Sequence, residues 1–175
     1  MTLKPTSPGA PMGPGTLHFF SGRIASGKTT AARALAANFN AVMICEDEWL
    51  ARLFDEALTL EQYLERRTRI RSILEVQVPQ ILSAGVPVVF DFAGNTRRDR
   101  AWVMSLAGAV AAPHVLHVLE VDESTCRRRL ELRNESQPPG IYWGQVSEQL
   151  FDQVNAHYQA PQPDEGLTIV AESST

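Results

Sequence analysis

The chain has 175 residues, 44% of them hydrophobic and 21% charged, which is ordinary for a single globular domain with a sizeable core. Its formal net charge of −4 argues against a long basic track for nucleic acid, and no apolar run reaches the roughly 18 residues of a membrane span. The two cysteines, Cys45 and Cys126, have neither metal-site nor disulfide spacing, so we expect a protein of the reducing cytoplasm.

The N-terminal segment differs in composition from the rest of the chain. Prolines stand at positions 5, 8, 11 and 14 and glycines at 9, 13 and 15, with little apolar content between them. We therefore predict a disordered leader over residues 1–15, one domain over 16–171 and a short tail over 172–175.

The stretch from Gly22 to Thr29 carries the strongest chemical signal. Gly22, four residues and then Gly27-Lys28-Thr29 fit the phosphate-loop pattern G-x-x-x-x-G-K-[ST]. An apolar run, 17–20, precedes the pattern and an alanine-rich helical stretch, 30–37, follows it, as such a loop requires. We expect Lys28 to reach the β- and γ-phosphates and the Thr29 hydroxyl to hold Mg²⁺. The predicted nucleotide-binding residues are Gly22, Arg23, Ile24, Ala25, Ser26, Gly27, Lys28, Thr29 and Thr30.

Three acids follow the next predicted strand. The apolar run 41–45 is typical of a buried strand, and Glu46-Asp47-Glu48 comes directly after it. In open α/β sheets ligands bind at the carboxyl ends of the strands, so Asp47 is a candidate catalytic residue. Asp47 also suits the N-cap of the helix that follows, and the two interpretations do not exclude each other.

A long helix is predicted from 59 to 84, with Pro79 as a kink or break. Apolar residues recur in it near helical spacing, namely Leu60, Leu64, Ile70, Ile73, Leu74 and Ile81. Arginines at 66, 67, 69 and 71 read as a solvated face, although one of them is a candidate for binding a substrate anion.

Polar residues also follow the third predicted strand, 86–90. Asp91 stands at its end, where such a carboxylate orients Mg²⁺ through water or accepts N–H bonds from the next loop. Asn95 opens a helix that runs to about 110, and it is a candidate both for the helix cap and for substrate contact.

The last third of the chain predicts a fourth strand at 114–121, helices after 122–125 and over 147–158, and a final strand at 167–171. His114 and His117 fall on opposite faces of the fourth strand, so we interpret them as structural. Arg129 and Arg133 share one helical face, which favours a phosphate clamp, with a solvated basic face as the alternative. The alternation of strands and helices predicts an α/β fold with a parallel sheet and helices on both faces.

Together these motifs resemble the P-loop kinase group that includes polynucleotide 5′-kinases, chloramphenicol phosphotransferase and the zeta-toxin kinases. Beyond the phosphate loop, the matches are Asp47 nineteen residues after Lys28, the strand 88–91 with Asn95 and the arginine-rich stretch 97–102, the stretch 129–134, and Pro163-Asp164-Glu165-Gly166 before the last strand. The resemblance implies a five-stranded parallel sheet of order 2-3-1-4-5 with a helical lid. It also implies that ATP and Mg²⁺ bind, that Asp47 takes the acceptor hydroxyl's proton, and that Arg129 and Arg133 cover the phosphates with Lys28.

One position departs from the polynucleotide kinases, which place an arginine three residues after the base. Here that position is Leu50, and the nearest arginine is Arg52. We therefore expect an ATP-dependent phosphotransferase acting on a hydroxyl of a small molecule such as a sugar, nucleoside, nucleotide-sugar or antibiotic. A polynucleotide 5′-hydroxyl kinase and a nucleotide-driven switch without a small acceptor remain alternatives. The candidate substrate residues are Asp47, Arg52, Asp91 and Asn95, and the candidate Mg²⁺ residues are Thr29 and Asp91.

Overall fold

The computed structural model describes residues 13–54, 60–139 and 144–173. Within these ranges a single sheet is formed by β1 (Leu17–Ser21), β2 (Val42–Cys45), β3 (Val88–Ala93), β4 (His114–Glu120) and β5 (Ile169–Ser173). The strand order is β2-β3-β1-β4-β5, and every neighbouring pair is parallel. The predicted fold class and strand order are therefore confirmed.

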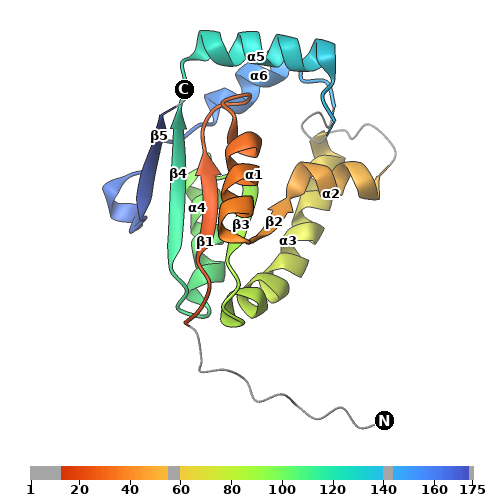
Figure 1. Cartoon of the computed structure of the whole chain (residues 1–175). Helices are drawn as coiled ribbons and strands as arrows, with labels where there is room; N and C mark the ends of the chain where they lie inside the picture. Colours follow the sequence, from red (N-terminus) through yellow and green to blue (C-terminus); the bar gives the residue numbers. More distant parts are fainter. Residues whose placement is uncertain (1–12, 55–59, 140–143, 174–175) are drawn as a thin grey trace.

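Helices cover both faces of the sheet and the end where its strands finish. They are α1 (Lys28–Phe39), α2 (Glu46–Leu53), α3 (Leu60–Ser83), α4 (Arg97–Gly108), α5 (Glu123–Ser136) and α6 (Glu148–Ala156), with a 3-10 turn, η1, at Pro163–Glu165. α1 lies on one face and α4 on the opposite face, while α5 and α6 cross the end toward which the arrows of β1 and β4 point (Figure 1). No helix within the described ranges has both the length and the apolarity needed to cross a bilayer.

The alternation of side chains along each strand builds a separate apolar cluster on each face of the sheet. The cluster under α3 and α4 includes Leu17, Phe19, Val88, Phe90, Leu116, Leu74, Val78, Leu82, Val103 and Leu106. The smaller cluster under α1 consists of Phe20, Ala32, Ala36, Val89 and Leu119. Because both faces are covered, the strands carry the continuous apolar runs that the sequence shows.

The predicted long helix is α3, and Pro79 lies inside it without ending it. Its buried face follows a spacing of four residues, namely Ile70, Leu74, Val78 and Leu82. Leu64 and Ile73 belong to the apolar pattern but are 49% and 58% exposed, so they lie outside this buried face. The buried stripe of α3 is therefore narrower than the set of all apolar residues in the helix.

Two predicted boundaries shift. The leader falls mostly on residues outside the described ranges, but Gly15 is buried and its N–H donates to the Leu82 carbonyl. At the other end, β5 runs to Ser173, so Glu172 belongs to the sheet and the tail predicted from 172 was wrong there. The reason lies in the pairing of β5 with β4, which aligns Glu120 with Ser173 and is not visible from local sequence.

A chain of polar side chains crosses the sheet beneath α1. His18 of β1 is hydrogen-bonded through Nδ1 to His117 Nε2 at 3.1 Å, and His117 Nδ1 lies 2.8 Å from Glu172 Oε1. The rings of His18 and Phe39 stack at 5.3 Å. The structural role predicted for His117 fits this arrangement. Burial, and secondarily the neighbouring His117, lowers the pKa of His18 from 6.5 to about 4.

This shift predicts a pH-dependent contribution to stability. Between pH 6.5 and about 4 the unfolded chain binds a proton at His18 that the folded chain does not, so the free energy of unfolding falls as the pH falls through this window. We expect the His18 contribution to reach on the order of 2 kcal/mol. Urea unfolding at pH 7.5 and at pH 5 measures how far the free energy of unfolding falls between the two pH values. This fall should be smaller for His18→Gln than for the wild type, and an equal fall in both proteins would contradict the assignment.

Candidate active site

The phosphate loop joins β1 to α1, and its backbone enters the left-handed region at one glycine and one alanine. Gly27 precedes α1 with φ 101°, and Ala25 also adopts the left-handed region with φ 59°. A Cβ on Gly22 would lie 2.7 Å from Ser26 Oγ, so only glycine fits there without a shift. These constraints fold the loop back over the start of α1, where the helix dipole favours anions.

Lys28, the first residue of α1, points back into this loop. Its Nζ donates to the carbonyls of Gly22 at 2.8 Å and Arg23 at 2.6 Å. Burial lowers the pKa of Lys28 to about 8, although Asp91 and Asp47 act in the opposite direction. The lysine therefore sits as a desolvated cation at the mouth of the loop, with two carboxylates near it.

Asp47 lies in the first turn of α2 and is exposed at the surface of the protein. The N-cap of α2 is Cys45, so the interpretation of Asp47 as the helix cap was wrong. The surrounding protein and the charge of Asp91 raise the pKa of Asp47, while Lys28, Arg133 and Arg67 lower it. Asp47 thus shares one electrostatic environment with the lysine of the phosphate loop.

Asp91 lies inside β3, two residues before its end, and pairs in register with Cys45. The predicted strand end at Phe90 was too early because Phe92 is also buried and packs with Phe90 and Trp102. The Cys45 thiol donates to Asp91 Oδ2 at 3.3 Å. Burial and Asp91 raise the pKa of Cys45, which keeps the thiol protonated as a donor. Sequence reasoning gave Cys45 no such role.

Helix α5 brings two of its arginines toward the phosphate loop. Arg129 Nη1 donates to the Ser26 carbonyl at 3.3 Å, and the charge of Arg133 acts on both Lys28 and Asp47. Arg127 turns the other way and pairs with Glu123, Glu148 and Asp152. The helix is anchored by an apolar cluster of Val121, Cys126, Leu130 and Phe151, against which Ile24 and Ala25 of the loop pack.

The remaining loop residues lie at the edges of this site. Ile24 donates its N–H to Asn155 Oδ1 of α6 at 3.3 Å, and Arg23 borders a hollow that also involves Asn155. Thr29 lies in the first turn of α1 and Thr30 is exposed. Arg52 is 73% exposed and pairs with Glu48 at 2.8 Å on the surface of α2.

Asn95 takes a role that was not predicted for it. Thr96, not Asn95, caps α4, because the Thr96 side chain accepts from the Asp99 N–H. The Asn95 amide instead contacts Gly22 on both sides: Oδ1 accepts from Gly22 N–H at 2.9 Å and Nδ2 donates to the Gly22 carbonyl at 2.9 Å. The side chain is buried and turned into the loop.

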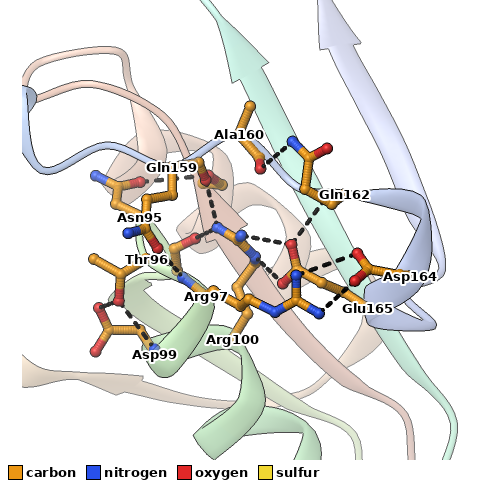
Figure 2. A network of polar contacts seen from close by, with 12 residues as sticks. Asn95, Thr96, Arg97, Asp99, Arg100, Gln159, Ala160, Gln162, Asp164 and Glu165 are labelled. Atoms are coloured by element: carbon orange, nitrogen blue, oxygen red, sulfur yellow. Dashed lines mark hydrogen bonds and ion pairs between the residues drawn. The ribbon is translucent and has the colours of Figure 1, made fainter.

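A buried arginine fixes the segment that carries Asn95. Arg100, 0% exposed, donates Nε and Nη2 to the two carboxylate oxygens of Glu165 at 2.7 Å each. Its Nη1 donates to the carbonyls of Gly94 at 3.1 Å and Gln159 at 2.7 Å (Figure 2). The Pro-Asp-Glu-Gly ending therefore has a structural explanation here, since it supplies the counter-charge of Arg100.

A second group of charged residues joins α2, the helix that carries Asp47, to α3 and α4. Glu46 is buried and lies 2.8 Å from Arg67, which together with Arg71 pairs with Asp99 Oδ1 of α4. Burial raises the pKa of Glu46 to about 7, although both arginines lower it. Two of the four clustered arginines are thus tied into the interior. Of the other two, Arg69 pairs with Glu65 on the surface and Arg66 lies over the Phe54 ring.

With this geometry established, sequence comparison decides the family. The chain belongs to the AAA domain family. The family profile (AAA_33) matches residues 17–161, which contain every candidate site residue of this AAA domain. No curated protein matches the chain.

Solved structures similar to this AAA domain include several with kinase descriptions. A candidate kinase from Chloroflexus aurantiacus has a TM-score of 0.73 at 16% identity, covering 92% of this chain and 89% of that one. Chaetomium thermophilum Kti12 with ADP-AlF3 has a TM-score of 0.65 at 18% identity, covering 89% and 88%. Mycobacterium tuberculosis APS kinase CysC with AMPPNP and APS has 0.57 at 15%, covering 91% and 90%. These likenesses confirm that the chain has the fold of the P-loop kinase group.

The Glu46–Arg67 pair generates a prediction. In Arg67→Met the carboxylate of Glu46 loses the arginine that contacts it and keeps only the charge of Arg71, so the pKa of Glu46 rises further and its ionisation above pH 7 costs more. We expect a loss of about 3 kcal/mol in the free energy of unfolding at pH 8.5 and a smaller loss at pH 6, where Glu46 is protonated.

The matched control is Arg69→Met, which breaks the exposed pair with Glu65 and should cost under about 0.5 kcal/mol at both pH values. Urea unfolding curves measure all three proteins. A loss in Arg67→Met that is the same at pH 6 and pH 8.5 would rule out the proposed dependence on Glu46.

Proposed function

We propose that the protein is an ATP-dependent phosphotransferase that moves the γ-phosphoryl group to a hydroxyl of a small molecule, with Asp47 as the general base. The observation that carries the proposal is the convergence of Lys28, Asp47, Asp91 and Arg133 at the carboxyl ends of the strands. A passive nucleotide binder needs the lysine and the loop, but not a carboxylate of raised pKa beside them.

The residues of the loop fit the phosphates of a nucleotide. The Ser26 hydroxyl is buried without a hydrogen-bond partner, and the left-handed residues beside it shape a cradle of backbone N–H groups. No group of three or more His, Cys, Asp or Glu among the described residues could enclose a metal ion. Mg²⁺ does not require one, because it binds through one or two protein groups together with phosphates and water. We assign Thr29 and Asp91 to that role.

The chain's own groups divide the reaction between them. Lys28 bonds the β- and γ-phosphates, and Arg129 and Arg133 approach from α5 to stabilise the charge of the transferred group. Asp47 accepts the proton of the acceptor hydroxyl as the new P–O bond forms, and its raised pKa makes the carboxylate a stronger base. Bound Mg·ATP supplies the phosphoryl group: its bond between the γ-phosphorus and the bridging oxygen of the β-phosphate breaks, and ADP leaves.

The surroundings of Asp47 favour a small acceptor over a nucleic-acid end. Leu50, at the position where polynucleotide kinases place an arginine, is 6% exposed and packs in the core, so it presents no charge to a phosphate backbone. Arg52 lies on the outer surface of α2 and is paired with Glu48. The net charge of −4 points the same way.

Replacing the base gives the clearest test. Asp47→Asn should lower kcat for phosphoryl transfer by about 10²- to 10⁴-fold while Mg·ATP affinity stays within about threefold. The acid limb of the wild-type rate profile should lie above the ordinary aspartate pKa of 3.8, because Asp47 must be ionised to act. Asp164→Asn makes the same chemical change at an exposed carboxylate before β5 and should leave the rate unchanged.

The assay is transfer from γ-³²P-ATP to a panel of nucleosides, 5′-hydroxyl oligonucleotides, sugars, nucleotide-sugars and hydroxylated antibiotics. Label on one small-molecule class, lost in Asp47→Asn, supports the proposal and names the acceptor. Label on oligonucleotides alone, with a steep salt dependence, would replace it with a nucleic-acid kinase. Tight nucleotide binding with no transfer to any acceptor would favour the switch.

A further inference from the structure

Four arginines cluster near the start of α3, and one of them differs from the other three in its partners. Arg67, Arg69 and Arg71 each form an ion pair with at least one carboxylate. Arg66 forms no hydrogen bond or ion pair within the part of the chain that the structure describes, and its Nη1 is buried without an acceptor. A buried cationic donor without an acceptor is costly, and an anionic ligand would remove that cost.

An aromatic ring, and not a carboxylate, holds the guanidinium of Arg66. Its central carbon lies over the ring of Phe54, 3.9 Å from the ring centre, and Phe54 is the residue at which α2 ends. A ring against the flat face of a guanidinium leaves the N–H groups along the edge available. The residue is half-buried, so part of it remains accessible. A carboxylate or a phosphate matches this edge because either group can accept two N–H bonds at once.

Arg66 lies where α3 packs against α2, the helix that carries the proposed base (Figure 1). The neighbouring Arg67 contacts Glu46 at 2.8 Å, and Glu46 directly precedes Asp47 in the first turn of α2. Arg66 contacts the other end of the same helix, at Phe54. Asp47 and Phe54 are seven positions apart, which corresponds to about 10 Å along a helix.

We infer that Arg66 binds an anionic group of the acceptor, and that this group is a carboxylate or a phosphate several bonds away from the hydroxyl that is phosphorylated. The inference rests on the proposed phosphotransferase function and narrows its acceptor to molecules such as sugar acids and sugar phosphates. Arg66 forms no covalent bond in the reaction. The acceptor oxygen attacks the γ-phosphorus, its proton passes to Asp47 and ADP leaves, while the anion of the acceptor stays on Arg66.

The test measures transfer from γ-³²P-ATP to matched neutral and anionic acceptors. D-Glucose and D-gluconate test a carboxylate, and D-ribose and D-ribose 5-phosphate test a phosphate. In the wild type, kcat/KM for the anionic member of at least one pair should exceed that of its neutral partner by at least about tenfold. The pair that shows the preference identifies which of the two anions the site takes.

Arg66→Met removes the charge but keeps a long apolar side chain against Phe54. It should raise KM for the preferred anionic acceptor by about 10- to 100-fold and change kcat by less than about threefold, because the arginine holds the acceptor equally in the ground and transition states. For the neutral partner kcat/KM should stay within about twofold of wild type, as should the affinity for Mg·ATP. Arg66→Lys should fall between the two proteins, since an ammonium lacks the paired donors of a guanidinium.

Arg69→Met is the matched control, because it makes the same change in the same helix at an exposed arginine that is paired with Glu65. It should leave the preference for the anionic acceptor unchanged. Thermal unfolding separates binding from structural support: Arg66→Met should have a Tm no lower than that of the wild type, because the variant lacks the buried cation without an acceptor.

Three results would overturn the inference and leave the proposed function intact. They are wild-type transfer that favours the neutral members or neither, a preference for the anion that survives in Arg66→Met, and a lower Tm in Arg66→Met with equal losses of kcat/KM for both members of a pair. A wild-type chain that transfers phosphate neither to these four sugars nor to any acceptor of the wider panel would overturn the proposed function and this inference together.

Discussion

The backbone of Gly22 is the point on which the site depends. It follows the last residue of β1, begins the phosphate loop, and is bound by two side chains: Lys28 from the start of α1 and Asn95 from just beyond β3. The lysine bonds only the Gly22 carbonyl, whereas the asparagine amide bonds both the N–H and the carbonyl. A loop that must present N–H groups to an anion needs such a fixed point, because without ligand its polar groups have few other partners.

Charge balance around the loop follows from the same geometry. Burial disfavours the ammonium of Lys28, Asp47 and Asp91 offset part of this penalty, and Asp91 also raises the pKa of Asp47. In the proposed function, an incoming nucleotide brings negative charge to this lysine and to Arg133. Beneath the site, Glu46, Arg67 and Asp99 tie α2 to α3 and α4, so the helix that carries Asp47 is held by buried ion pairs on its inner side.

Local patterns in the sequence predicted much of this arrangement, and long-range pairing accounts for most of what they missed. The phosphate loop is a continuous stretch whose glycines and lysine predict its conformation. The strand–helix alternation predicted a parallel sheet, and the resemblance to P-loop kinases implied its strand order. Asn95 was placed at the right edge, but its bonds to Gly22 were not predicted, because they span 73 residues. Asn155, which reaches the loop across 131 residues, carried no signal, and the β5 boundary depended on pairing with β4.

The most direct test of the account is a crystal structure of the protein with Mg²⁺ and a non-hydrolysable ATP analogue. We predict that Lys28 Nζ bonds the β- and γ-phosphates, that Asn95 keeps both bonds to Gly22, and that Asp47 faces the γ-phosphate from the acceptor side. A nucleotide bound elsewhere, or a nucleotide in the loop with no phosphate contact from Lys28, would contradict it.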